Sequence, residues 1–337
     1  MTKRKTGVWL IGACGAVSTL TCVGARAIAR GLKPPIGVLT ESPLFDGLDL
    51  VGIDDLVFGG HEVRDTDLHC AAREFRDRAG ILDQPLLGVL HDDLLAIDQN
   101  LRPGYIVNPT TAVQELAKNG KVARARSPRT VVEGIQKDLR EFQERHDLET
   151  VIVINVSSTE PPGHLPIEYA DLEAFRKSLQ SKRARKGLTA SVLNAYAAID
   201  AGFPFVNFTP SPGSTIPALM QLAEERGVPH MGSDGKTGET LVKSALAPLF
   251  AGRALRVLSL DSNNKLRNRD GYELHDPLAR ERNTRSKERA LRQIHGVEDT
   301  HSSVPNEYVP RLDDWKVAWD DIHFEGFLGA PMSMQFT

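Results

Sequence analysis

The chain alternates short apolar runs with amphipathic segments. The run Gly7–Ile11 is apolar without interruption, which is typical of a strand buried in a parallel sheet. Small residues follow at Gly12–Thr19, and the alanine-rich segment Leu20–Arg30 has the pattern of a helix. A strand, a glycine turn and a helix in this order predict the opening βαβ unit of a nucleotide-binding sheet.

The same two patterns continue along the chain. Strands are expected at Asp55–Gly60, Thr150–Val156, Pro204–Asn207 and Leu255–Leu260, with a strand-like run at Trp315–Trp319. Helices are expected at Asp67–Ala79, Arg129–His146, Leu188–Ala201, Ile216–Arg226 and Thr240–Phe250. Asp65 or Thr66 is the candidate cap of the first of these helices. The polar loop Ser157–Pro162 follows the strongest strand, at the end where open parallel sheets bind ligands.

Composition narrows the class of protein. A length of 337 residues suits two domains, or one domain with a large insertion. The net charge of −3 and the aromatic content of 6% argue against a nucleic-acid-binding surface. Three cysteines without CxxC spacing predict neither a disulfide framework nor a zinc site, and the histidines form no metal motif. No apolar run approaches the roughly 20 residues of a membrane span, so we expect a soluble cytoplasmic protein.

The turn at residues 12–18 is a candidate phosphate site. Its small residues let the backbone approach a pyrophosphate, and the following helix supplies amide donors and a partial positive charge. The spacing departs from a full GxGxxG, because Val17 or Ser18 stands at the third glycine position. A tight strand-to-helix turn without a ligand is the alternative.

Two further features carry candidate chemistry. A ribose-binding carboxylate is expected at the end of the second strand, and Glu41 and Glu62 both qualify. The loop at residues 232–243 is broken by glycines, enters a helix and carries Lys236, which suits a phosphate or oxyanion site. A capped surface helix with exposed lysines is the alternative.

The arginine-rich segment Lys265–Arg292 is either a functional loop with a surface helix or part of an assembly interface.

Several motifs, in one order along the chain, resemble those of the myo-inositol-phosphate synthase family. They are the "STLT" after the glycine turn, DDLVFGGHEV at 54–63, VIVINVSSTE at 151–160, PFVNFTP at 204–210, the segment 230–243, NRDGYEL at 268–274, RSKE at 285–288 and LDDWKVAWDD at 312–321. Their common order is more specific than any single motif.

The resemblance implies an NAD-dependent isomerase that acts on glucose 6-phosphate. In such an enzyme NAD oxidises C5, the resulting ketone acidifies C6, C6 attacks the C1 aldehyde, and C5 is then reduced again. A dianionic phosphate and a developing enolate call for clustered ammonium groups in a dry pocket. The resemblance also implies a homo-oligomer, a tetramer made by the second domain, and a product used in inositol and phospholipid biosynthesis.

Site residues follow from the resemblance position by position. Gly12, Cys14, Gly15, Ala16 and Val17 would face the pyrophosphate. Glu62 would bind the adenosine ribose, which selects it over Glu41. Ser157, Ser158 and Thr159 would lie beside the cofactor, with Asn207 and Asp234 near the nicotinamide. The implied catalytic residues are Lys236, Lys243, Asp270, Asp314 and Lys316, and no metal ligand is implied.

The chain also departs from the family pattern. The cofactor turn is one residue shorter than in the family and lacks its asparagines. Leu241 and Leu278 stand where the family has lysines, and the sequence ends at Thr337, before a further family lysine. Two other functions are therefore considered: action on a different sugar phosphate in another cyclitol pathway, and a non-catalytic NAD-binding paralogue.

The expected architecture is α/β. A doubly wound Rossmann-type NAD-binding domain is expected at residues 1–200, and an inserted α+β catalytic and tetramerisation domain at 201–315. Residues 316–337 are expected to return to the NAD-binding domain.

Overall fold

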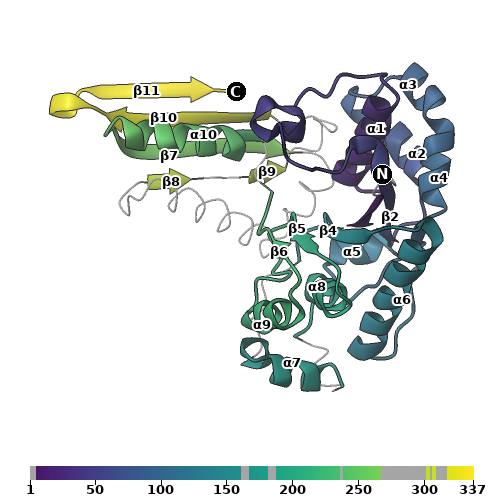
Figure 1. The fold of residues 1–337 in the computed structure, drawn as a ribbon. Helices are drawn as coiled ribbons and strands as arrows, with labels where there is room; N and C mark the ends of the chain where they lie inside the picture. The colour runs from purple at the N-terminus through teal and green to yellow at the C-terminus, as the bar shows by residue number, and fades with distance from the viewer. Residues whose placement is uncertain are drawn as a thin grey trace. The chain divides into compact units, whose positions relative to one another are not determined.

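The structure is a computed structural model in which residues 5–160, 167–180, 187–235, 238–266, 301–303, 306–308 and 317–337 are described. These residues divide into two compact units. Unit 1 comprises residues 1–157 and 163–232, and unit 2 comprises residues 158–162 and 233–337. Figure 1 labels most of their helices and strands.

Unit 1 is built on a six-stranded sheet whose strands all run parallel, in the order β3-β2-β1-β4-β5-β6. The strands are β1 (Thr6–Ile11), β2 (Leu56–Glu62), β3 (Leu101–Pro103), β4 (Thr150–Asn155), β5 (Phe205–Asn207) and β6 (His230–Met231). The strand order reverses between β1 and β4, which is the topological switch point where doubly wound sheets bind their ligands.

Nine α-helices belong to the described residues of unit 1. They are α1 (Ala16–Ala29), α2 (Leu68–Ala79), α3 (Gln84–Val89), α4 (His91–Asp98), α5 (Thr111–Leu116), α6 (Pro128–His146), α7 (Leu172–Ser178), α8 (Ala190–Asp200) and α9 (Pro217–Arg226). Helix α1 begins four residues earlier than the pattern predicts. The cap of α2 is Asp67, whose carboxylate accepts the Cys70 N–H at 2.6 Å, and not Asp65 or Thr66.

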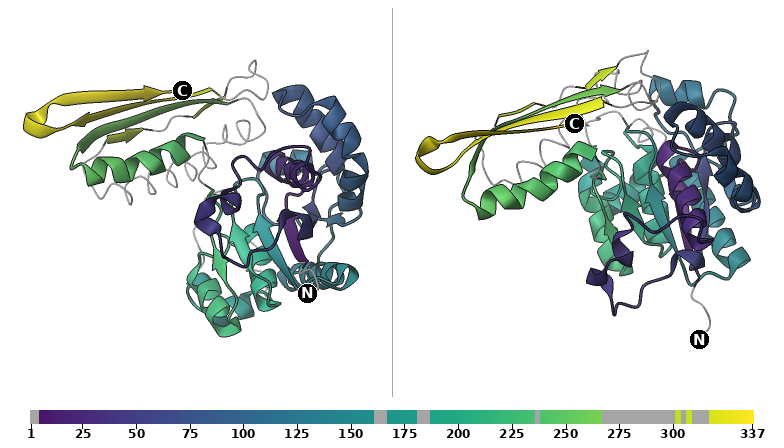
Figure 2. Two further views of the ribbon diagram at one scale, coloured as in Figure 1. Left: turned by 45° about the horizontal axis from the view of Figure 1, so that its top comes forward. Right: turned by 90° about the horizontal axis from the view of Figure 1, so that it is seen from above.

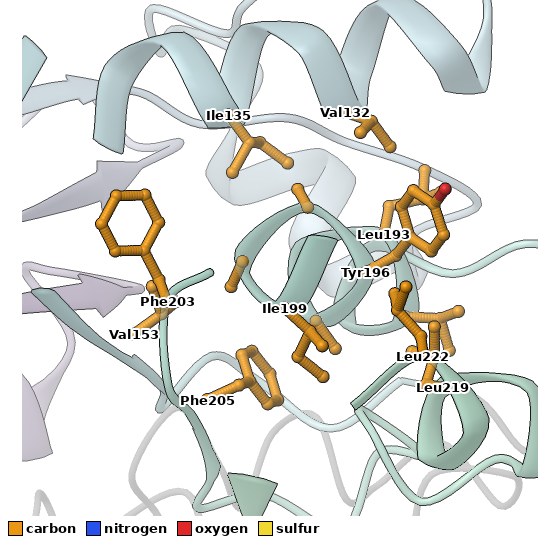
Figure 3. Packing of buried hydrophobic residues seen from close by; sticks show 14 of the residues in the cluster. Val132, Ile135, Val153, Leu193, Tyr196, Ile199, Phe203, Phe205, Leu219 and Leu222 are labelled. Atoms are coloured by element: carbon orange, nitrogen blue, oxygen red, sulfur yellow. The ribbon is translucent and has the colours of Figure 1, made fainter. Parts of the chain in front are cut away.

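Alternate residues of β1 enter two separate cores, one on each face of the sheet. Val8 and Leu10 pack with side chains of α1, α2, α3 and α4. Trp9 and Ile11 face the other way and pack with α6, α7, α8 and α9. Figure 3 shows part of this second core, with Ile135, Leu193, Ile199, Leu219 and Leu222 gathered beside Val153 and Phe205 of the sheet. Helices therefore cover both faces, as the doubly wound prediction requires.

The described residues of unit 2 form a smaller mixed sheet and one long helix. Its strands are β7 (Arg256–Leu266), β8 (His301–Ser303), β9 (Asn306–Tyr308), β10 (Val317–Glu325) and β11 (Pro331–Phe336). The order is β11-β10-β7-β8, with β9 also paired to β7. Helix α10 (Gly238–Gly252) lies along this sheet (Figure 2). Its Phe250 packs against Val257, Leu260, Ile322 and Phe324.

The division between the units differs from the one drawn from sequence. Strands β5 and β6 complete the sheet of unit 1, and helix α9 packs in its core. The division therefore falls at residues 232–233 and not at 200. The tail strand β10 pairs antiparallel with β7 over Val317–Glu325 and therefore belongs to unit 2. Strand β5 is only three residues long, and its partners are distant in sequence, so a local pattern gives little indication of this grouping.

Candidate dinucleotide site

The turn after β1 is held by backbone hydrogen bonds that leave little room for side chains. The amides of Gly12 and Ala13 both donate to the carbonyl of His61, at 3.0 Å each, and Gly15 N–H donates to the Gly12 carbonyl at 3.0 Å. Gly12 has a φ of +88°, a conformation that favours glycine. A Cβ there would lie 3.1 Å from the Cα of Ser157, so the turn packs closely on the loop after β4.

Helix α1 begins directly at this turn with its first amides available. Its N-cap is Gly15, and no side chain caps the helix. Ala16 and Val17 are exposed, whereas Ala13 and Cys14 are buried. Uncapped amides and the positive end of the helix dipole at an exposed turn favour an anion such as a pyrophosphate.

Glu62, the last residue of β2, joins this turn to the neighbouring strand. It is 8% exposed, and its Oε2 accepts the backbone N–H of Cys14 at 2.8 Å. Its Oε1 accepts the backbone N–H groups of Val63 and Arg64, at 2.8 and 2.9 Å. Three backbone donors hold the carboxylate at the end of β2, which is where dinucleotide-binding domains place the acceptor for the adenosine ribose.

His61, the residue before Glu62, points to the other face of the sheet and holds the end of β2 in place there. His61 is buried; its Nδ1 accepts the indole N–H of Trp9 at 3.2 Å, and its Nε2 lies 2.9 Å from Asp138. Because Trp9 can only donate, Nδ1 is the acceptor, and Nε2 carries the proton that is donated to Asp138. The strand end that presents Glu62 is thereby tied to β1 and to α6.

Arg64 also contacts the turn, although it was not among the residues predicted from sequence. Its guanidinium donates to the carbonyl of Cys14 and lies 3.5 Å from Glu62. A cation beside the carboxylate at the end of β2 could affect the choice between NAD and NADP, because arginines at this place in dinucleotide-binding domains accommodate a 2′-phosphate. Its contact with Cys14 joins positions that are 50 residues apart, so a local sequence pattern gives no signal for it.

Cys14 contributes its backbone to the turn. The thiol is buried, and burial raises its pKa, with the nearby Glu62 carboxylate acting in the same direction. A thiol held in its neutral form is a poor nucleophile. Cys22 is also buried, and burial raises the pKa of Cys22 to about 12.

The loop after β5 is also tightly built. Asn207 is buried, and its Nδ2 donates to the carbonyl of Ser211 at 2.6 Å. Two glycines with positive φ, Gly213 and Gly232, pack on this residue, and a Cβ at Gly232 would lie 2.2 Å from the Asn207 carbonyl oxygen. Asn207 and Ser157 therefore stand in fixed positions at the carboxyl ends of β5 and β4.

In unit 2, Lys243 is buried between α10 and the sheet. It is 2% exposed, its ammonium nitrogen lies 2.5 Å from Oδ1 of Asp320, and it donates to the hydroxyl of Ser262. The Ser262 hydroxyl donates to the same Asp320 oxygen at 2.6 Å. A buried ammonium thus has both a carboxylate and a hydroxyl partner, which offsets the loss of its hydration. Neither partner was identified from sequence.

The remaining expected residues fall into two groups. Ser158, Thr159 and Asp234 belong to unit 2. The expected catalytic residues outside the described part of the chain are Lys236, Asp270, Asp314 and Lys316, and Leu278 also lies outside it. Leu241, which stands in place of a family lysine, is 57% exposed on α10.

None of the helices within the described ranges has the length and apolar character to cross a membrane. Within the same ranges, no cluster of three or more histidine, cysteine or acidic side chains has metal-binding geometry.

A parallel sheet with a switch point, an uncapped helix after a glycine turn and a buried carboxylate at the end of β2 define unit 1 as a dinucleotide-binding domain of the doubly wound α/β class. The residues of the turn fit the cofactor, since no side chain caps the start of α1 and Ala16 and Val17 there are exposed to an approaching pyrophosphate.

The chain belongs to the myo-inositol-1-phosphate synthase family, whose NAD-binding sequence model matches residues 6–335. It is 32% identical to inositol-3-phosphate synthase 1 of Bacteroides thetaiotaomicron, over 98% of this chain and 79% of that protein. It is 28% identical to inositol-3-phosphate synthase isozyme 1 of Arabidopsis thaliana, over 86% of this chain but only 56% of the relative. NAD is the cofactor of this family of isomerase-type enzymes.

Solved structures show the same fold. The inositol-3-phosphate synthase of Caenorhabditis elegans superposes with a TM-score of 0.81 at 23% identity, covering 99% of this chain and 71% of that one. A myo-inositol-1-phosphate synthase-related protein from Thermotoga maritima superposes with a TM-score of 0.75 at 21% identity, covering 99% of this chain and 81% of that one.

Proposed function

We propose that this chain catalyses the NAD-dependent cyclisation of glucose 6-phosphate to a myo-inositol phosphate. The observation that carries the proposal is the link between Glu62 and the glycine turn, in a chain that the family model matches from residue 6 to residue 335. The chain spans 79% of the Bacteroides relative and 56% of the Arabidopsis relative, so its activity is inferred from the part that they share.

The residues of unit 1 would hold the cofactor. The amides at the start of α1 would bind the pyrophosphate, and the small residues Gly12, Cys14 and Gly15 would let it approach the turn. Glu62 would accept hydrogen bonds from the adenosine ribose, because its carboxylate is already held in place by three backbone donors. When bound there, NAD supplies a hydride acceptor for C5 of the sugar and later returns the hydride.

The proposed catalytic residues are those expected from the motifs of the family. Lys236, Lys243, Asp270, Asp314 and Lys316 are the proposed catalytic residues, with Asn207 and Asp234 beside the nicotinamide. Ammonium groups stabilise both a phosphate dianion and the enolate that forms when a C6 proton leaves. The enolate carbon then attacks the C1 aldehyde, and the ring closes with no net oxidation.

We also propose that the chain forms a homo-oligomer, a tetramer, and acts in the cytoplasm in inositol and phospholipid synthesis. The support for assembly is an apolar pair on the turn between β10 and β11. Phe327 and Leu328 are 88% and 89% exposed. Adjacent exposed apolar side chains of this size favour burial against a partner.

Product analysis tests the proposed reaction. The purified protein is incubated with NAD and glucose 6-phosphate, phosphorus NMR follows the sugar phosphates, and absorbance follows NADH. The proposal predicts an inositol phosphate with no net NADH. Net NADH that accumulates with an oxidised sugar phosphate would contradict it, as would tight NAD binding without any product. A panel of other sugar phosphates identifies the substrate in either case.

A further inference from the structure

Asn155, the last residue of β4, stands at the switch point of the sheet. It pairs in register with Ile11 of β1 on one side and with Asn207 of β5 on the other. Ile11 directly precedes the glycine turn. The side chain of Asn155 is fully buried, at 0% exposure.

The Asn155 amide uses all of its hydrogen-bonding capacity on the two neighbouring loops. Its Nδ2 donates to Oδ1 of Asn207 at 3.2 Å and to Oγ1 of Thr209 at 3.4 Å. Its Oδ1 accepts the hydroxyl of Ser157 at 2.7 Å and the Ser157 backbone N–H at 3.3 Å. A side-chain amide has two donors and two acceptor lone pairs, so each is matched.

These contacts connect the loop after β4 to the loop after β5. The main chain repeats the connection, because the Phe208 N–H donates to the Asn155 carbonyl at 2.9 Å. Ser157 in turn packs on Gly12, where a Cβ would lie 3.1 Å from its Cα. One buried amide therefore fixes the distance between three loops at the carboxyl edge of the sheet.

The position of Asn155 indicates which half of the dinucleotide lies beside it. In doubly wound domains the two mononucleotide halves lie on opposite sides of the switch point. Glu62 marks the adenosine half over β1, β2 and β3, so the nicotinamide half lies over β4, β5 and β6. We propose that Asn155 is a positioning residue for the nicotinamide end of the site, an inference that rests on the cofactor placement proposed above.

Asn155 acts through Ser157 and Asn207 and does not touch the cofactor. Its fully satisfied amide holds the Ser157 loop against the glycine turn and the Asn207 loop beside it. An apolar side chain of similar size leaves Ser157 and Thr209 without these partners, so both loops become free to shift. The adenosine half, which Glu62 and the turn amides organise, keeps its hydrogen bonds.

Comparing two ligands tests this assignment. Binding of NAD and of ADP-ribose, which lacks the nicotinamide, is measured by calorimetry for the full chain and for Asn155→Leu. We expect NAD affinity to fall about tenfold or more and ADP-ribose affinity to change less than about twofold. Asn155→Ser, which keeps one donor and one acceptor, should lose part of the affinity for NAD, and it carries the test if Asn155→Leu does not fold.

Asn100→Ala is the matched control. Asn100 is also buried, and it binds the Phe58 carbonyl at 3.0 Å and His146 at 2.7 Å at the start of β3. It should lower the melting temperature and leave the affinities for both ligands unchanged. Equal losses of NAD and ADP-ribose affinity in the Asn155 variants, or no loss of either, would overturn the assignment. A wild-type chain that binds ADP-ribose as tightly as NAD would instead contradict the proposed placement of the nicotinamide.

Discussion

Glu62 shows how far a single residue can be understood from sequence. Its place at the end of a glycine-bearing strand makes it one of two candidates for a ribose carboxylate, and the family resemblance selects it over Glu41. The structure adds the three backbone donors that hold it. The positions of Arg64 and Asn155 could not be predicted in the same way. Their partners are 50 and 52 residues away in sequence, so their roles depend on which loops the sheet brings together.

Glu62→Gln tests the carboxylate. The amide keeps one acceptor oxygen but turns an N–H₂ group toward backbone donors, and it loses the charge that opposes Arg64. NAD affinity should fall about tenfold, equivalent to about 1.4 kcal/mol. The preference for NAD over NADP should also fall, because the cation remains. Calorimetric titration with both cofactors measures these effects, and an unchanged ratio of the two affinities would count against the ribose assignment.

Asp98 should make the stability of the folded protein depend on pH. Its Oδ1 accepts the Leu68 N–H at 2.7 Å, but burial raises the pKa of the carboxyl from 3.8 to about 6, and the nearby Asp67 adds to the rise. Between these two values the folded state binds more protons than the unfolded state. The contribution of Asp98 to stability is therefore fully present below the lower pKa and is lost as pH rises through about 6.

Asp98→Asn removes this pH-dependent loss and keeps an acceptor for Leu68. The variant should be more stable than wild type by about 1 kcal/mol at neutral pH, after discounting for solvent screening, with little difference at acidic pH. Urea unfolding of the variant and the wild type at the two pH values measures the effect. A variant that is equally destabilised at both would show that the charged form is needed.

At the scale of elements, uninterrupted or strongly periodic segments were predictable. The predicted strand at Gly7–Ile11 and the predicted helix at Arg129–His146 match β1 and α6 to within one residue at each end. The short helices α3, α4 and α5 were not predicted, since six to eight residues give too few turns for a periodic pattern. The tail strands could not be assigned to unit 2 from sequence, because strand pairing is a long-range property.

The buried ion pair between Lys243 of α10 and Asp320 of the sheet should stabilise unit 2. Lys243→Met leaves the buried Asp320 carboxylate without its ammonium partner and should destabilise unit 2 by about 3–5 kcal/mol. The double variant Lys243→Met with Asp320→Asn removes both charges and should recover most of that stability. If Lys243 is also catalytic, the double variant stays inactive.

Thermal unfolding and product formation are measured together in these variants. Lys137→Met, on the exposed face of α6, is the control and should change neither quantity. Recovery of activity along with stability in the double variant would assign Lys243 a structural role only.

At the scale of the whole molecule, the proposed oligomer would bury surfaces that are exposed in a single chain. Replacing Phe327 and Leu328 with aspartate places charge on the turn between β10 and β11, which should disfavour burial against another copy. Light scattering should show a smaller assembly than the wild type, with the melting temperature of unit 1 unchanged. An unchanged assembly mass would place the interface elsewhere.

The central claim is that one chain both removes and returns the hydride at C5 of glucose 6-phosphate. The most direct measurement is the fate of deuterium at C5, followed by mass spectrometry of the product in the presence of NAD. The account predicts an inositol phosphate that retains the label, with no deuterated NADH released. A product without the label, or deuterated NADH formed without cyclisation, would contradict it.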